Sequence, residues 1–575
     1  RQEEIEYLFK HALAQEAAYE SILLQQRKEL HRSVANSIEK VFSERLHEFY
    51  GMLAMHYGKA EDWEKAEEFM LKAGEEALRS SASNEALHFF KEALAIYLKR
   101  YGDQVDEEKV AMMEKNIAYA LLCKGHMIEA IQYFDSCLAR YGFKSPQSPL
   151  SIVWRLLNSV SSLFISLYFP RLKWKRVPDK RDNEISRLFA ERTTALVIAD
   201  PQRYFIEELY YCGKILPKFD LAKVDNGGGW YSGAIPLFSL TGISFKLGKK
   251  ALDFVEEKID KGDARAAIWF ETHALTHCIN VGDWDVVEDY DSDLVKRSLD
   301  LGELFFVVHY PHWQTYPKIE QGNAAFAHKL ADSLFEISNV YENDDAMALG
   351  LWLKALVMTK FRQLHGALET AKEAVSFLKR PGCEIYLIPT YSQVAHIHML
   401  LGDFSSAKEL LQDAHKTSSG ITTYPMAHSM LLECQLAYDI LQLEIAMKNG
   451  KKIEIEEYRG AALKSGKKMI ANNKKTIFTR IESFRSMGCY FWLIDKQKKA
   501  LSWWTKSIVE GERLGAKLEL SRTYFEVGKR LLESQSKYKD LSGISAEEYL
   551  EKAKVLFEEM DLEWDLAELE KVYVA

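Results

Sequence analysis

The sequence predicts an all-α protein, a right-handed superhelix of antiparallel helix pairs, and three observations support this. Ala407, Leu411 and Ala414 lie at i, i+4 and i+7, a small–large–small stripe on one helix face, and similar stripes recur along the chain. Several stripes follow a short turn such as Gly402-Asp403-Phe404. The chain has only 12 prolines and 30 glycines in 575 residues, and its 47% hydrophobic content excludes general disorder. Such recurrence is the signature of a helical repeat array.

The stripe at Ala407 is the best-formed copy. Gly402 can adopt the left-handed conformation that ends a helix, and Asp403 or Ser405 can cap the next one. Small residues on either side of a large one let a neighbouring helix approach closely. The positions expected at such repeat contacts are Ala66, Ala73, Ala86, Phe90, Ala93, Ala130, Phe134, Ala367, Ala374, Gly402, Ala407, Leu411, Ala414, Ala500, Trp504, Leu550 and Ala553.

The stripe after a Gly-Asp-aromatic turn resembles the tetratricopeptide repeat. The spacing from Ala367 to Ala407 is 40 residues and that from Ala86 to Ala130 is 44. Both exceed the roughly 34 residues of that repeat. The resemblance therefore implies a degenerate array with lengthened helices.

Residues 7–35 resemble a junction between the nucleotide-binding part and the repeat array of STAND-class signalling ATPases. Proteins of this kind occur beside class III adenylate or guanylate cyclase domains, as in soluble adenylyl cyclase-like proteins, or beside serine/threonine kinase domains. The residues in step with the junction are Phe9, His11, Tyr19, Arg27, Leu30 and His31. Further resemblance to the first and last repeats of that family covers residues 63–69, 84–94, 514–524 and 549–557.

That resemblance implies a P-loop ATPase upstream, and we expect the chain to be a piece of a longer protein because Arg1 runs directly into patterned sequence. Within the chain, Gly242–Lys250 comes nearest to a P-loop. It has five residues between the glycines where four are needed, and Lys250 stands where a hydroxyl should bind Mg²⁺. We therefore expect no nucleotide site here.

The pattern divides the chain into five expected regions. The hydrophobic helix and the glycine-rich stretch make the third region atypical. The regions are a junction at 1–45, a first repeat block at 46–145, a helical segment at 146–250 with a hydrophobic helix at 150–169 and an inter-helix loop at 226–233, a middle repeat block at 251–450, and terminal repeats at 451–575.

The hydrophobic helix at 150–169 has a wide apolar face and a narrower arc of serines with Arg155 and Asn158. It is long enough to span a bilayer, and basic residues follow it. We expect a helix buried in the array; a membrane-surface or partner-docking helix and a transmembrane helix are the alternatives. Candidate partner or membrane contacts are Lys173, Trp174, Lys175, Arg176, Trp230 and Tyr231.

Charge and cysteine content exclude other classes. A net charge of −9, from 75 basic and 84 acidic residues, argues against nucleic-acid binding as the primary role. The seven cysteines are scattered without a Cys-x-x-Cys pair, so neither a disulfide framework nor a zinc site is indicated, and a cytoplasmic location fits best.

Candidate catalytic patterns are incomplete. His273 and His277 are one helical turn apart, but no glutamate follows the first histidine as in a metalloprotease. The acidic groups at 288–293 and 342–345 lack the spacing of a Mg²⁺ site and are expected to face solvent. We expect no catalytic residue, metal or cofactor.

These observations predict a non-catalytic sensor and scaffold module. It would bind a protein, peptide or small effector and regulate upstream catalytic domains of the same polypeptide. A stand-alone helical enzyme and a passive assembly scaffold are the alternatives.

Overall fold

The computed structural model describes residues 12–80, 82–172, 175–287 and 290–574. These residues are overwhelmingly helical, and antiparallel helix pairs stack into a superhelical array, which confirms the predicted fold class. The chain forms two compact units, one of residues 1–121 and 132–142 and one of residues 122–131 and 143–575. Phe9, His11, Lys173 and Trp174 lie outside the described residues, as does a short strand that the alternation at 5–9 suggests.

The first unit contains five complete helices and shares two with the second unit. Asp62 caps one of these helices by accepting a hydrogen bond from the Lys65 amide. The helices are α1 (Ala12–Ser21), α2 (Leu24–Val41), α3 (Tyr50–Lys59), α4 (Trp63–Arg79) and α5 (Ser83–Tyr101), with α6 (Glu107–Lys124) and α7 (Met127–Arg140) divided between the units.

Three of the residues that match the junction motif, Tyr19, Arg27 and His31, lie close together in this unit. The Tyr19 hydroxyl and His31 Nε2 are 2.9 Å apart. The Arg27 guanidinium lies 5.0 Å from the centre of the Tyr19 ring, and its Nε donates to the Ile22 carbonyl at 2.7 Å. The motif therefore fastens α1 to α2.

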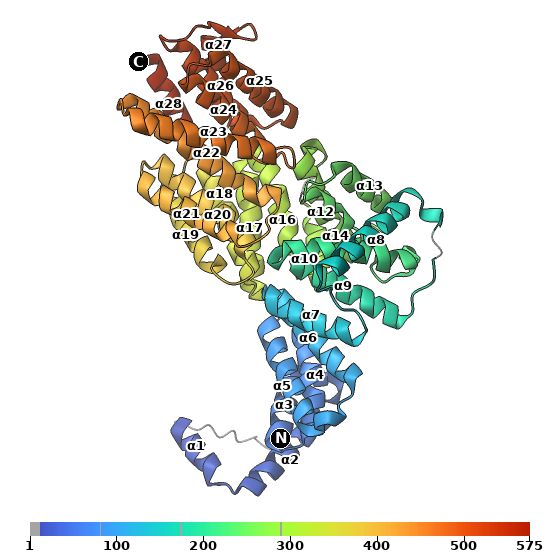
Figure 1. The fold of residues 1–575 in the computed structure, drawn as a ribbon. Coiled ribbons are helices and arrows are strands. Elements are labelled where there is room, and N and C mark those ends of the chain that lie inside the picture. Colours follow the sequence, from blue (N-terminus) through green and yellow to red (C-terminus); the bar gives the residue numbers. More distant parts are fainter. Residues whose placement is uncertain (1–11, 81, 173–174, 288–289, 575) are drawn as a thin grey trace. The chain divides into compact units, whose positions relative to one another are not determined.

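The second unit begins with shorter, irregularly arranged helices and ends in a regular array (Figure 1). The first group is α8 (Pro149–Tyr168), α9 (Lys180–Ala199), α10 (Pro201–Tyr210), the π-helical turn η4 (Tyr211–Ile215), α11 (Gly227–Tyr231), α12 (Ala234–Ser239), α13 (Phe245–Glu256), α14 (Ala264–Val281) and α15 (Ser292–Asp300).

The regular array consists of helix pairs joined by short turns. Its helices are α16 (Leu304–Glu320), α17 (Ala324–Tyr341), α18 (Asp344–Lys360), α19 (Leu364–Leu378), α20 (Glu384–Leu400), α21 (Phe404–Ser419), α22 (Pro425–Lys448), α23 (Lys452–Asn472), α24 (Arg480–Leu493), α25 (Gln497–Leu514), α26 (Lys517–Leu532), α27 (Ala546–Glu559) and α28 (Glu563–Val574), with the two-residue strands β1 (Asp540–Leu541) and β2 (Ile544–Ser545) before α27.

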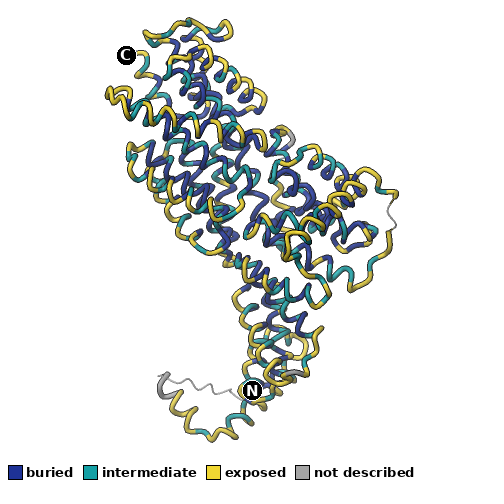
Figure 2. The backbone as a smooth tube through the Cα atoms, viewed as in Figure 1, coloured by how far each residue is buried: buried dark blue, intermediate teal, exposed yellow. Residues whose placement is uncertain are grey.

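The even-numbered helices of this array form its inner layer. Helices α16, α18 and α20 are buried on nearly every face, whereas α19 and α21 bury one stripe and expose the rest (Figure 2). Inner helices also contact the next inner helices along the array, and α16 reaches α26. A helix that is apolar all round needs neighbours on all sides, and this requirement produces the inner layer.

The repeat-contact residues lie where helices meet. Apart from Gly402, each of the 17 positions named above is at most 4% exposed. Gly402 has φ of +83° and closes α20, and Asp403 caps α21 by accepting from the Ser406 amide at 3.1 Å.

Helix α8 does not have the predicted burial. The side that faces the protein carries Ser159, Ser162 and Ser166 together with Leu163 and Leu167, all buried, while the other large apolar residues are mostly exposed. It is the one helix among those described that is long and apolar enough to cross a membrane by length and composition, and 28% of its apolar window is buried. The prediction of a buried helix is wrong because serines, which bond back to their own helix, pack more closely than the large apolar residues.

The glycine-rich stretch is also not the expected loop. Gly227–Tyr231 forms the short helix α11, and Trp230 and Tyr231 are 4% and 1% exposed, so neither is a surface contact. A Cβ on Gly227 would lie 2.2 Å from the Leu221 carbonyl oxygen. The glycines therefore allow close packing.

The first testable prediction concerns Ala407. Replacing Ala407 with Phe inserts a ring into a fully buried contact and should lower the free energy of unfolding by about 1–3 kcal/mol. Urea unfolding measures this, with Lys408→Phe at the exposed next position as control. Equal midpoints for the two variants would contradict the assigned contact.

Candidate functional site: an apolar cavity beside a buried charge network

An apolar cavity lies in the second unit between the inner layer and the helices that precede it. The space open to the centre of a water-sized sphere is about 110 Å³, enough for more than a single water. Helices from α9 to α22 supply its walls, and aromatic side chains predominate. They include Trp230, Trp269, Phe306, Trp313, Trp352 and Tyr386. Mostly apolar walls with a few polar groups are typical of small-molecule sites.

Prolines inside the inner helices shape the cavity wall. Pro389 stands within α20 and Pro311 within α16, where a proline has no amide hydrogen to donate to the residue four positions earlier. The carbonyl of Ile385 is therefore without its usual helical donor. Ile385 and Pro389 both line the cavity.

Several histidines line the cavity, and most of their polar contacts are made within the protein. His309 accepts or donates at 2.8 Å with the Tyr386 hydroxyl, and its other nitrogen lies 2.8 Å from the Phe305 carbonyl. His273 Nδ1 is 2.7 Å from the Ser232 hydroxyl. Burial lowers the pKa of His273 to about 3 and that of His309 to about 4. These rings are therefore neutral near pH 7.

Two polar nitrogens in this wall have no hydrogen-bond partner among the described residues. They are His312 Nδ1 and Trp352 Nε1, and the two rings are 5.3 Å apart. Burial, with a smaller contribution from His309, lowers the pKa of His312 to about 3. Buried polar groups in native proteins nearly always find a partner, so these nitrogens are candidates for contact with a ligand.

The histidines do not form a metal site or a catalytic pair. His277 bonds Ser239 at 2.8 Å while His273 bonds Ser232, so the two rings do not share one ligand position. A Ser–His pair can serve a nucleophilic enzyme, but His277 has a pKa lowered to about 4 by burial and both serines are fully buried. We interpret both pairs as structural.

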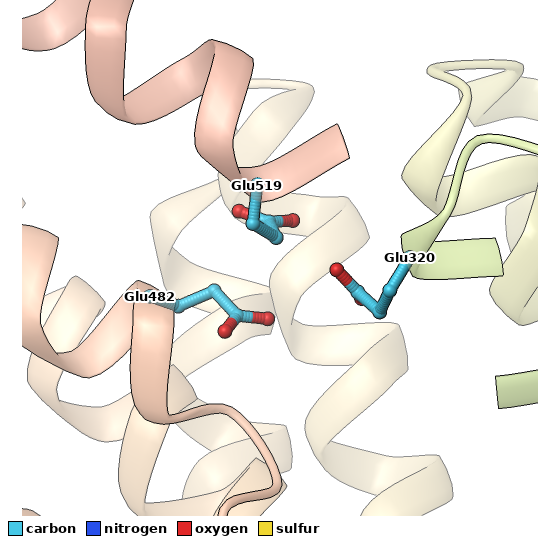
Figure 3. A group of neighbouring side chains, drawn as sticks. All are labelled: Glu320, Glu482 and Glu519. Carbon is cyan, nitrogen blue, oxygen red and sulfur yellow. The ribbon is translucent and has the colours of Figure 1, made fainter. Parts of the chain in front are cut away.

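A charged cavity adjoins the apolar one. Met430 and Phe478 line both, and the second provides about 90 Å³ to the centre of a water-sized sphere. Its centre is the Lys360 ammonium, which lies within 2.9 Å of three carboxylates. Their distances from Lys360 Nζ are 2.9 Å for Glu320, 2.9 Å for Glu482 and 2.7 Å for Glu519. Figure 3 shows the three glutamate side chains pointing toward one another.

The ends of four inner helices create this cluster. Glu482 and Glu519 stand in the first turns of α24 and α26, where the helix dipole favours a negative charge, and Lys360 ends α18, where it favours a positive one. Glu320 ends α16, where a negative charge is disfavoured. Burial raises the pKa of Glu320 to about 7 despite Lys360. Although burial opposes it, the three carboxylates raise the pKa of Lys360 well above its usual value.

The three glutamates have the spacing of a cation site, since one oxygen of each lies within 4.8 Å of the others. The Lys360 ammonium stands among them and supplies the compensating charge, with Arg485 and Arg522 adding ion pairs to Glu519 at 2.7 Å and 3.2 Å. The cluster is therefore a buried ion network crossing the array.

Arg362 is the exception in this network. It has φ of +62°, and its Nε has no hydrogen-bond partner among the described residues. Burial, and then repulsion by Arg522, lowers its pKa to about 9. Arg362 and His396 both line the charged cavity. Burial lowers the pKa of His396 to about 3, so its ring is neutral, and Arg362 is the cation of this pair.

The structure places the other sequence-predicted residues apart from these cavities, except Trp230, which lines the apolar one. Lys175 is exposed, and Arg176 pairs with Asp182 at 2.5 Å. Asp345, expected to face solvent, is buried against Arg380, and burial raises its pKa to about 6. Ser244 caps α13 within the P-loop-like stretch, and Gly242 occupies the turn before it.

Sequence reasoning did not find the cavity because its residues come from at least seven helices. One signal was present: residues 304–320 and 384–400 are apolar on all faces and contain prolines. That combination marks helices buried on all sides, but it does not reveal which helices meet.

The fold and site define a class, an all-α superhelical repeat protein with an apolar, aromatic-lined cavity. No protein-family model matches the chain, and a search of the curated proteins gave no match.

Solved structures of other helical proteins show a loose likeness. The Rap protein complexed with competence and sporulation factor is 11% identical with a TM-score of 0.43, over 81% of this chain and 100% of that one. The APC/C hetero-tetramer Cut9–Hcn1 is 13% identical with a TM-score of 0.43, over 93% of both chains. Yeast Tom70 is 12% identical with a TM-score of 0.29, over 95% of this chain and 96% of that one. At these scores, no function follows for this chain.

The second prediction tests the ion network. Lys360→Met leaves three buried carboxylates without their shared cation and should cost about 3–5 kcal/mol of unfolding free energy. The exposed pair of Lys448 with Glu444 gives the control, since Lys448→Met should cost under about 1 kcal/mol.

The pH dependence of Lys360→Met separates this cause from simple packing loss. Carboxylates whose folded pKa is raised bind more protons in the native than in the unfolded state, so stability falls as pH rises from about 4.5 through about 7. The deficit of Lys360→Met in urea unfolding should therefore be smaller at low pH than at high pH. A deficit independent of pH would contradict the charge explanation.

The third prediction concerns His312. Its folded pKa of about 3 lies below the ordinary 6.5, so the unfolded chain alone takes up the proton and stability is lost as pH falls from 6.5. Between pH 6.5 and about pH 5 this loss amounts to about 1.5 kcal/mol. Over this pH interval, the unfolding free energy of His312→Phe should fall by about 1.5 kcal/mol less than that of the parent protein. His365→Phe, at an exposed position, is the control. Parallel pH curves would disprove a buried neutral His312.

Proposed function

We propose that this chain is a non-catalytic sensor and scaffold module of a cytoplasmic, multidomain signalling ATPase or nucleotide cyclase. Its second unit binds an effector, and occupancy regulates catalytic domains that precede the module. The apolar cavity is the observation that carries the proposal, because an array serving only as a scaffold has no need of an aromatic-lined space between its helices.

The lining indicates the chemistry of the effector. An apolar or aromatic body would fill the space between Trp230, Trp269 and Trp352, with a hydrogen-bonding group at His312. A polar or anionic end would pass Met430 and Phe478 toward Arg362. A small molecule or a single apolar peptide side chain with its neighbouring backbone fits this arrangement.

Coupling to other domains follows from the position of the cavities. The walls include the inner helices α16, α18, α20 and α22, and the ends of α16, α18, α24 and α26 are fixed to one another by the Lys360 network. An effector that binds two arrangements of these helices with different affinities shifts the population toward one of them. The contacting tyrosine, arginine and histidine at residues 19, 27 and 31 support placing the module after a nucleotide-binding part, as their resemblance to the STAND junction suggests.

The fourth prediction tests the cavity directly. The probe is 8-anilinonaphthalene-1-sulfonate, an aromatic anion whose fluorescence rises in apolar sites. Ala427 lines the cavity, and Ala427→Phe should weaken saturable probe binding at least about tenfold by filling it. Ala471→Phe, at an exposed position of α23, should leave binding unchanged.

The regulatory claim has a separate readout. In the full-length parent protein, ATPase or cyclase activity of Ala427→Phe should differ from that of Ala471→Phe at equal thermal stability. Equal activities, together with lost probe binding, would identify a ligand-binding scaffold without a switch. Unaltered probe binding by Ala427→Phe would remove the cavity as the effector site.

A further inference from the structure

Helix α8 carries an apolar stripe on its exposed side. We define the stripe as the large apolar residues of α8 whose side chains are exposed, and Phe169 and Leu172 extend it beyond the helix. Its most exposed members are Leu150 at 84%, Trp154 at 70% and Leu157 at 62%. The complete stripe is Leu150, Val153, Trp154, Leu157, Val160, Phe164, Ile165 and Tyr168. These positions recur at i, i+3 or i+4 and i+7, so they share one face.

The segment around the stripe is strongly basic. Residues 144–178 contain six lysines or arginines and no aspartate or glutamate, in a chain whose net charge is −9. Arg171 and Lys175 follow the helix and are exposed, and the Lys250 ammonium of α13 lies 5.8 Å from the centre of the Tyr168 ring. Cations therefore border the end of the stripe.

The opposite face of α8 is held to the rest of the second unit. The Ser162 hydroxyl donates to the Gly213 carbonyl at 2.5 Å, and a Cβ on Gly213 would lie 2.6 Å from the Ser159 carbonyl oxygen. Arg155 pairs with the buried Glu207 at 3.3 Å. A helix fastened along its polar side cannot cross a bilayer without breaking these contacts, but it can lie in the plane of a surface.

We propose that α8 docks the module on a membrane surface rich in anionic lipid. The apolar stripe enters the boundary between headgroups and acyl chains, with Trp154 and Tyr168 at the depth that amphipathic aromatic rings prefer. Arg171 and Lys175 contact lipid phosphates or carboxylates at the end of the helix. The serine side and its contacts with η4 remain in the protein.

Charge decides between a lipid surface and a second copy of the chain. Pairing two stripes would bring the basic segments of both copies together, and their cations would repel one another. An anionic bilayer neutralises the same cations while it covers the stripe. The apolar stripe and the basic residues around it thus fit an anionic bilayer better than a second copy of the chain.

The test is flotation of the purified whole chain with vesicles. Vesicles of phosphatidylcholine with about 30% phosphatidylserine should carry the protein upward, and pure phosphatidylcholine should carry much less. Trp154→Glu with Leu157→Glu should reduce the bound fraction at least tenfold. Arg171→Glu with Lys175→Glu should abolish the preference for phosphatidylserine.

The matched control is Ile453→Glu. Ile453 is 85% exposed on α23, so its change adds a charge at an isolated apolar position and should leave flotation unaltered. Circular dichroism melting verifies that each variant folds. Because the substituted residues are exposed, we expect all variants to fold.

Other outcomes would overturn the proposal. Protein that remains at the bottom of the gradient with both vesicle types would show that α8 does not bind membranes. Light scattering that shows a dimer broken by Trp154→Glu with Leu157→Glu, without flotation, would assign the stripe to self-association. Equal flotation of Ile453→Glu and the stripe variants would show that binding lies elsewhere.

Discussion

The ammonium of Lys360 joins inner helices that are distant from one another in the sequence. It lies at the end of α18 and contacts carboxylates of α16, α24 and α26, and Glu519 of α26 is 159 residues from Lys360 in the sequence. A repeat array otherwise gains its stability from neighbouring helices alone. This network adds long-range contacts, and removing one member leaves charges buried without compensation.

The cavity depends on the same packing of the inner helices. Inner helices that are apolar on every face, such as α18 and α20, must pack against several neighbours, yet a space remains among them that is lined by tryptophans and Pro389. The space that remains has apolar walls on one side and the charge network on the other, with Phe478 between them. An occupant of the first cavity therefore lies within one side chain of the network that fixes the helix ends.

Helix α8 shows how burial can run against hydrophobicity. Serines pack at the interface with η4 because Gly213 allows backbone approach, and apart from Leu163 and Leu167 most of the larger apolar residues are left outside. Such an arrangement costs free energy in water unless another surface covers the apolar side. The basic composition of residues 144–178 distinguishes this surface from an ordinary protein contact.

The sequence by itself determined the fold class, because small–large–small stripes and Gly-Asp turns are local patterns that specify helix pairs. It predicted which residues meet within a pair, as at Ala407 and Leu411, since both lie on one helix face. Only the tertiary structure decided the site. Lys360 and its three carboxylates, or His312 and Trp352, come from helices far apart in the chain, and no local period encodes which of them meet. The tertiary structure likewise decided which side of α8 packs inward, because the backbone at Gly213 approaches that side closely. The hydrophobic periodicity of α8 carries no information about this partner.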